Sequence, residues 1–266
     1  MPGQRARSAL TGGRGRRFAD VRWIASTGST NADAIALARQ NGPEGIVVVA
    51  DHQSAGRGRQ GRTWVAPPGS SLLLSVLLRP PAEVRDLCTM AVAVAAVDAV
   101  AEVAGLTTKL KWPNDLVWPG DGSERDRKLA GVLAESDGDA VVVGIGINVD
   151  WPEELPDDLS LVATSCNHIM GAPVDREDLL IALLQHLDLR YTPLVASSDR
   201  IPLLEAWRKR SATLGQRVRV ELADGEEIVG TAIDITELGH LVVEDDLLMT
   251  QTVAAGDVIH LRAAPD

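Results

Sequence analysis

Short apolar runs alternate with longer helical stretches along residues 21–213, and this pattern predicts one mixed domain of strands and helices. Strands are expected where β-branched or apolar residues follow one another, at 46–50, 72–78, 109–112, 115–118, 128–135 and 140–149. Helices are expected at 32–40, 85–104, 176–191 and 200–211, with Asp175 as the N-cap of the third. This order of elements favours an α/β (α+β) fold with a largely antiparallel or mixed sheet.

The most apolar stretch, residues 87–104, is rich in Ala and Val but contains Asp98 and Glu102. It is too short and too polar to span a bilayer, so we predict a buried helix and no membrane partner. Residues 54–62 are polar, Gly-rich and Arg-rich and are expected to form a loop, and residues 119–127 an exposed hairpin tip.

Both ends of the chain differ from this central region. From Gly215 onward, short alternating strands at 217–222, 228–235, 241–244, 247–252 and 258–262 predict a small β-barrel. The first 20 residues place five arginines among Gly, Ser and Pro without apolar periodicity, so a disordered basic tail is expected. The predicted division is a tail at 1–20, a catalytic domain at 21–213 and a β-barrel at 214–266.

Charge and composition narrow the function. The net charge is −11, but residues 1–134 carry 17 Lys and Arg against 12 Asp and Glu, whereas residues 135–266 carry 9 against 25. So acidic a chain is a poor general nucleic-acid binder, while its basic half suits anionic small molecules. Cys88 and Cys166 cannot build a disulfide framework, and no apolar signal segment opens the chain, so we expect reduced thiols in the cytoplasm.

The most informative motif is the run Gly56-Arg57-Gly58-Arg59-Gln60-Gly61-Arg62, which lies between two predicted strands and is followed by Trp64. Its glycines let the backbone close around a ligand, and its arginines offer forked donors for phosphate or carboxylate oxygens. The alternatives are a flexible basic loop or an RNA-binding segment. RNA-binding segments of this type usually repeat in low-complexity sequence, whereas this one is single, so anion binding is favoured.

Two further segments carry polar groups at strand ends. In 111–115, Lys111, Trp112 and Pro113 precede Asn114 and Asp115, which suits a metal-nucleotide contact but also a purely structural turn. Lys128 enters a nearly apolar strand, which indicates either a cation held against a ligand or a lysine at a surface edge. The run 144–148 ends another strand in Gly-Ile-Gly-Ile-Asn, and its glycines permit close approach of the backbone.

Taken together and in this order, these motifs resemble the biotin–protein ligase family over about residues 22–264. The matching segments are 29–31, 53–62, Trp64, 111–115, 128–135, 144–148 and the C-terminal β-module. The resemblance implies a class II synthetase-like, mixed-sheet catalytic domain followed by an SH3-like β-barrel. It also implies the activity, in which biotin and ATP form biotinyl-5′-AMP and the biotin is then transferred to a lysine of a biotin carboxyl carrier domain of a carboxylase.

The resemblance assigns roles residue by residue. Biotin would be bound by Ser29, Thr30, Asn31, Gln53, Gly56, Arg57, Trp64, Lys128 and Gly131. ATP and its phosphates would be bound by Arg57, Arg59, Arg62, Trp64, Lys111, Asn114 and Asn148. The catalytic residues would be Lys128, Arg59, Lys111 and Asp115, with Asp115 as a candidate ligand of Mg²⁺. The Gly-Arg loop is expected to exclude water from the reactive adenylate.

Two other functions remain open at this point. A lipoate or octanoate ligase would share the catalytic fold, although such enzymes are expected to use a different Gly/Arg motif. A non-enzymatic biotin sensor that binds DNA would need a domain that the residues ahead of 21 are too few to form, so no specific DNA binding is expected. The chain is expected to be a monomer or a homodimer.

Overall fold

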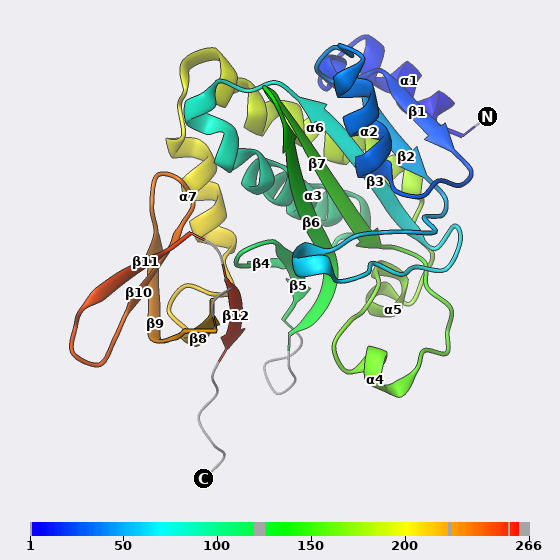
Figure 1. The fold of residues 1–266 in the computed structure, drawn as a ribbon. Coiled ribbons are helices and arrows are strands. Elements are labelled where there is room, and N and C mark those ends of the chain that lie inside the picture. Colours follow the sequence, from blue (N-terminus) through cyan, green and yellow to red (C-terminus); the bar gives the residue numbers. More distant parts are fainter. Residues whose placement is uncertain (1, 120–125, 223–224, 255, 261–266) are drawn as a thin grey trace.

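The computed structural model describes residues 2–119, 126–222, 225–254 and 256–260. Its larger part is a seven-stranded sheet in the order β1-β2-β3-β7-β6-β5-β4 (Figure 1). The strands of this sheet are β1 Val21–Ile24, β2 Val47–Ala50, β3 Ser71–Leu78, β4 Lys109–Lys111, β5 Asp115–Trp118, β6 Arg127–Asp137 and β7 Ala140–Asn148. Among the strand pairs within the described residues, only β1 and β2 run parallel, so the predicted mixed sheet is confirmed.

Helices cover the two faces of this sheet unequally. The helices are α1 Gln4–Thr11, α2 Thr30–Arg39, α3 Cys88–Ala104, α4 Asp157–Ser160, α5 Cys166–Met170, α6 Arg176–Ser197 and α7 Ile201–Arg210, with 3₁₀ turns η1 Arg16–Phe18, η2 Arg59–Gly61 and η3 Ala82–Leu87. Helices α3 and α6 pack behind the sheet, whereas α2 packs on the opposite face over β2, β3 and β7 (Figure 1).

The alternation of side chains along β7 explains this division. Val141, Val143 and Ile145 belong to the large core on the α3 side. Val142 belongs to the smaller core under α2, and Gly144 follows it on the same face, because successive residues of a strand point to opposite faces. The apolar side chains under α2 therefore give way to glycines as the strand approaches its end.

The span Ala82–Ala104, which includes η3 and α3, is long and apolar enough to cross a membrane by length and composition alone. Most of α3 is nevertheless buried, and it packs against α6 and the sheet. The Asp98 carboxylate pairs with Arg190 of α6 at 2.6 Å and with Arg210 of α7 at 2.5 Å. These contacts identify α3 as the core helix that the sequence predicted.

The N-terminal segment corrects a prediction. Residues 1–20 were expected to be disordered, but the described part forms α1 and η1, with Ala6, Leu10 and Phe18 fully buried. Arg5 reaches Asp175 at 2.7 Å and Asp178 at 2.9 Å at the beginning of α6. Asp175 also caps α6 by accepting bonds from the amides of its first turn, which confirms the predicted N-cap.

The C-terminal part is a five-stranded antiparallel sheet in the order β11-β10-β9-β8-β12. Its strands are β8 Arg217–Glu221, β9 Glu227–Ile235, β10 Leu241–Glu244, β11 Thr250–Val253 and β12 Asp257–His260. The strand predicted at 247–252 begins later, because residues 245–249 form a turn. Residues 120–125 of the predicted hairpin tip and 261–262 of the last predicted strand lie outside the described residues.

Candidate active site

A flat floor is built from two glycines on neighbouring strands. Gly131 of β6 and Gly146 of β7 are direct partners in the ladder. A Cβ atom on Gly146 would lie 2.6 Å from Cε2 of Trp64, and one on Gly131 would lie 3.0 Å from its Cζ3. The indole of Trp64 therefore lies against both strands, and only glycine permits this approach.

A small polar cavity lies between this floor and the N-terminal turn of α2. Gln53 Oε1 accepts bonds from the amide of Thr30 at 2.7 Å and from its hydroxyl at 3.0 Å. Ser75 Oγ lies 2.7 Å from Thr30 Oγ1 and 2.6 Å from Asn31 Oδ1. The cavity measures about 30 Å³, so a larger ligand must displace Trp64 or the Gly-Arg loop to enter.

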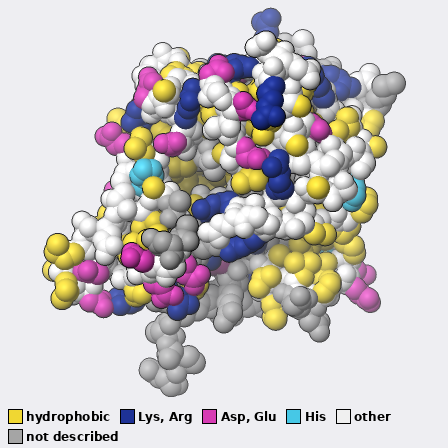
Figure 2. Space-filling view, viewed as in Figure 1, with side chains coloured by type: hydrophobic (Ala, Val, Ile, Leu, Met, Phe, Trp, Pro, Cys, Tyr) yellow, Lys and Arg dark blue, Asp and Glu magenta, His cyan; other side chains and the backbone are white. Residues whose placement is uncertain are grey.

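Basic side chains surround the adjoining cavity of about 340 Å³. It is lined by the Gly-Arg loop, by the turn between β4 and β5, and by Glu221, Val258 and Ile259 of the C-terminal sheet. Lys128 Nζ lies 2.7 Å from Asp115 Oδ1 and 5.4 Å from the centre of the Trp64 ring. Figure 2 shows Lys and Arg side chains gathered around the loop that contains η2.

A larger apolar cavity of about 730 Å³ opens on the other side of Lys128. Its walls come mainly from the irregular segment 151–163, and Leu161 and Val162 there are 70% and 57% exposed. Lys111, Asp115 and Asn148 line its polar end. The arrangement suits a molecule with a flat apolar group at one end and negative charge at the other.

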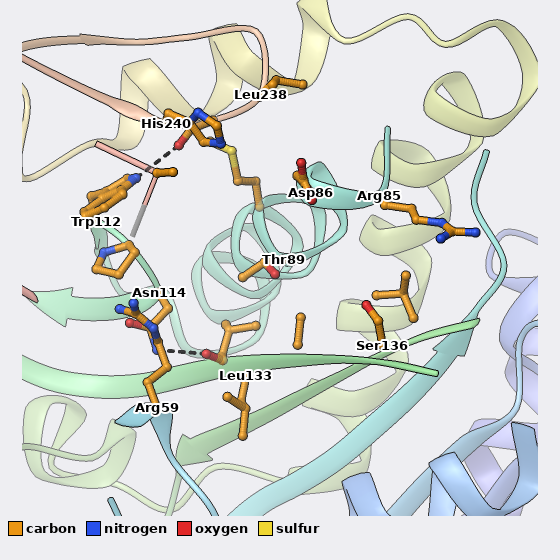
Figure 3. A pocket seen from close by; sticks show the side chains of 17 residues that line it. Arg59, Arg85, Asp86, Thr89, Trp112, Asn114, Leu133, Ser136, Leu238 and His240 are labelled. Atoms are coloured by element: carbon orange, nitrogen blue, oxygen red, sulfur yellow. Dashed lines mark hydrogen bonds between the residues drawn. The ribbon is translucent and has the colours of Figure 1, made fainter. Parts of the chain in front are cut away.

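A fourth cavity, of about 460 Å³, lies between α3 and the C-terminal sheet (Figure 3). Arg59 and Asn114 line it from the same side as the basic cavity, and His240 lines it from the C-terminal sheet. Trp112 Nε1 donates to the carbonyl of Gly239 at 3.0 Å, and Arg59 Nη1 donates to that of Gly256 at 3.2 Å. Turns of the C-terminal sheet therefore contact both the Gly-Arg loop and the segment 111–115 directly.

The comparison with known proteins agrees with this geometry. The profile of the "Biotin/lipoate A/B protein ligase family" matches residues 23–151, and that of the "Biotin protein ligase C terminal domain" matches residues 213–261. A biotin–[acetyl-CoA-carboxylase] ligase of Mycobacterium tuberculosis is 41% identical over 259 residues, covering 94% of this chain and 91% of that protein. The chain belongs to the biotin protein ligase family.

Other members of the family are similar over most of the chain. The bifunctional ligase/repressor of Bacillus subtilis is 34% identical over 224 residues, which cover 81% of this chain and 66% of that protein. The structure of the biotin protein ligase from Aquifex aeolicus in complex with biotin and ATP aligns with a TM-score of 0.76 and 26% identity, covering 92% of this chain and 99% of that one.

The predicted site residues of this biotin protein ligase family member line three neighbouring cavities. Ser29, Thr30, Asn31, Gln53, Arg57, Trp64 and Gly131 line the small cavity. Arg57, Arg59, Arg62, Trp64, Lys111, Asn114, Asp115, Lys128 and Gly131 line the basic one, and Asn148 lines the apolar one. Gly56, the first residue of the Gly-Arg loop, lines none of these three cavities. A Cβ atom on it would lie 2.5 Å from the carbonyl oxygen of Trp64.

Sequence reasoning missed two parts of the site. The apolar walls at 151–163 lie in a segment that is irregular apart from α4 and shows no helical or strand periodicity in its sequence, although its leucines and its Trp151 were a signal. Glu135 was quoted only as the end of a motif, but it contacts both Asn31 and Arg57. A carboxylate directly after the apolar run 129–134 is the feature that distinguishes it in the sequence.

The donor set fits a magnesium ion held mainly by phosphates. Asn148 Oδ1 is buried and has no hydrogen-bond partner within the part of the chain that the structure describes. It lines the same cavity as the carboxylate of Asp115. Mg²⁺ is usually bound by one or two protein oxygens together with substrate phosphates and water, so these two side chains are sufficient.

Cysteine nucleophiles do not contribute to this site. Cys88 and Cys166 are both free and buried, as expected. Burial raises the pKa of each thiol to about 12, so neither forms a thiolate at neutral pH. The chemistry must come from positioning of the substrates and stabilisation of charge.

Proposed function

We propose that this chain activates biotin with ATP and then transfers the biotin to a lysine of a biotin carboxyl carrier domain. The observation that carries the proposal is the meeting of three cavities at Trp64, with Lys128 lining the basic and the apolar one. The small polar cavity takes the ureido head of biotin, the basic cavity takes the phosphates, and the apolar cavity takes adenine. The Trp64 indole, above the two glycines, forms the wall along the biotin tail.

The first step joins the acid to the nucleotide. A carboxylate oxygen of biotin attacks the α-phosphorus of ATP, the bond to the bridging oxygen breaks, and pyrophosphate leaves. Lys128 neutralises the carboxylate and the charge that develops on the α-phosphate, while Arg59, Arg62 and Lys111 hold the phosphate oxygens. Asp115 holds the ammonium group of Lys128 in place, since the two groups lie 2.7 Å apart.

Magnesium bound through Asp115 and Asn148 would supply further neutralisation of the phosphates. In the second step the amine of the carrier lysine attacks the acyl carbon, AMP leaves with the bonding electrons, and the amine loses a proton. The Gly-Arg loop excludes water until that amine arrives. We expect the reaction to take place in the cytoplasm, where carboxylase carrier domains would be the partners.

The decisive test is biotin-dependent exchange of pyrophosphate into ATP, measured with the purified chain, Mg²⁺ and each of biotin, lipoate and octanoate. Exchange with biotin alone is expected, and no acceptor protein is needed to see it. Exchange with lipoate or octanoate in place of biotin would overturn the substrate, and no exchange with any of the three acids would overturn the activity.

A further inference from the structure

We propose that Glu135 is a positioning residue that joins the two walls of the biotin cavity, one on α2 and the other on the Gly-Arg loop. This inference rests on the proposed function, because it concerns the site in which biotin is activated. Glu135 lies on β6, on the same face as Gly131 and four residues further along the strand. Its side chain is 26% exposed, so it stands at the rim of the site rather than in the solvent.

One carboxylate oxygen of Glu135 holds the α2 wall. Asn31 Nδ2 donates to Glu135 Oε2 at 2.7 Å and to the carbonyl of Leu133 at 3.3 Å. Asn31 Oδ1 accepts from Ser75 at 2.6 Å, and the Asn31 side chain is 5% exposed. Glu135 thus completes the set of partners that fixes Asn31, and Asn31 directly follows Ser29 and Thr30, which like Asn31 are predicted to bind biotin.

The other oxygen holds the loop. Glu135 Oε1 lies 3.0 Å from Arg57 Nη1, and the Arg57 side chain is 47% exposed. Trp64 N donates to Gly56 O at 3.0 Å, and Gly58 N donates to Arg62 O at 2.7 Å. These two bonds flank the antiparallel bridge between Arg57 and Thr63, so the N–H and C=O of Arg57 point away from Thr63.

This geometry gives the ion pair a role other than stability. An exposed ion pair typically contributes little to folding, so removing this one should have a small effect on the melting temperature. The two residues that Glu135 contacts, Asn31 and Arg57, nevertheless both line one small cavity, and an error of about 1 Å in such a site has large effects on binding and rate. Glu135 sets the separation of the polar wall and the loop, and thereby the affinity for biotin.

The chain offers a matched control on the same strand. Asp137 of β6 pairs with Arg39 of α2 at 2.5 Å, so it also joins this strand to this helix by an ion pair. Arg39 is 71% exposed and lines none of the three cavities of the site. Asp137→Asn therefore breaks an ion pair between the same strand and α2 without touching the biotin cavity.

The experiment measures the KM for biotin and the KM for ATP in pyrophosphate exchange, together with melting temperatures, for the full chain and for Glu135→Gln, Glu135→Ala and Asp137→Asn. We expect both Glu135 variants to raise the KM for biotin roughly 5- to 30-fold, the effect of losing one or two modest interactions. Glu135→Gln keeps one acceptor oxygen and should show the smaller effect. The KM for ATP should stay within about twofold.

The outcomes separate this inference from the proposed function. If the unaltered chain shows no biotin-dependent exchange, the proposed function fails first. If that chain is active and both Glu135 variants keep its KM for biotin, the positioning role is wrong. Equal increases in the two KM values, or the same increase in Asp137→Asn, would also overturn it. Calorimetric titration of Glu135→Gln with biotin gives the affinity even if Glu135→Ala does not fold.

Discussion

The glycine floor under Trp64 permits a prediction whose size follows from distances. In Gly146→Ala the new Cβ would lie 2.6 Å from Cε2 of Trp64 and 2.8 Å from both Cζ2 and Nε1. These atoms belong to a rigid ring, so the whole indole must move by several tenths of an ångström. Overpacking of this kind costs about 1–3 kcal/mol. We expect the cost to appear as roughly 5- to 150-fold weaker biotin binding, because the loop that contains Trp64 gives way more easily than β7.

Unlike biotin binding, the folding stability of Gly146→Ala should change very little. Gly146 has no positive φ, so alanine fits the strand backbone without strain. Replacing glycine at such a position stabilises a protein by about 0.4–1 kcal/mol through the unfolded state, which offsets part of the overpacking. The expected signature is therefore weak biotin binding in a protein that melts near the temperature of the unaltered chain.

The assay is calorimetric titration with biotin, combined with the KM for biotin in pyrophosphate exchange. Gly12→Ala is the matched control, since a Cβ there would meet no atom within 4 Å and its φ is −105°. A KM for biotin within twofold of that of the unaltered chain would refute the assignment of Gly146 and Trp64 to the biotin cavity. A large fall in melting temperature would instead show that β7, rather than the loop, gives way.

Three further variants test other parts of the structure. Lys128→Ala should keep its fold by circular dichroism yet lose at least about 10²-fold in adenylate formation, and near-normal exchange would remove it from the catalytic residues. Arg59→Ala should release the adenylate, seen as faster biotin-dependent AMP formation without an acceptor, whereas unchanged retention would count against the role of the loop. Asp175→Ala removes the N-cap of α6 and a partner of Arg5, so it should cost about 1 kcal/mol and lower the melting temperature by roughly 2–4 °C at pH 7. Burial raises the pKa of Asp175, but hydrogen bonds from the Asp178 amide, Arg5 and the Glu177 amide hold that pKa below its usual value. The loss of stability in Asp175→Ala should therefore shrink as the pH falls below about 4 and Asp175 becomes protonated in both the folded and the unfolded state. Equal melting temperatures of the variant and the unaltered chain at pH 7 would contradict the capping role.

Much of the catalytic domain was predictable because its signals are local. The strands of the sheet centre are runs of β-branched and apolar residues, and α3 is an uninterrupted apolar stretch. Glycines at 131, 144 and 146 stand out in such strands, because a glycine weakens a strand unless something must approach it closely. The sequence therefore indicated both the strands and the glycines at which another group could approach them closely.

The N-terminal segment was mispredicted because its partners are distant in the sequence. Five arginines among small residues have the composition of a disordered tail, and the apolar residues that α1 and η1 bury are few and widely spaced. The acidic first turn of α6, which Arg5 contacts, lies about 170 residues away. No window of local periodicity contains both halves of that contact, so tertiary packing decides the structure.

The same reasoning explains why the residue types of the site were easier to predict than their connections. That Gly131 and Gly146 face the ligand follows from the alternation within each strand, but their direct pairing depends on the register between β6 and β7. A shift of that register by two residues that paired Gly131 with Asn148 would keep every side chain on its face and still separate the two glycines, so Trp64 would meet a side chain. The register also places Glu135 beside Val142, next to the α2 side of the cavity. One register thus fixes the floor under the indole and the carboxylate that joins Asn31 to Arg57, which is why we expect changes at Gly146 and at Glu135 to weaken the binding of the same ligand.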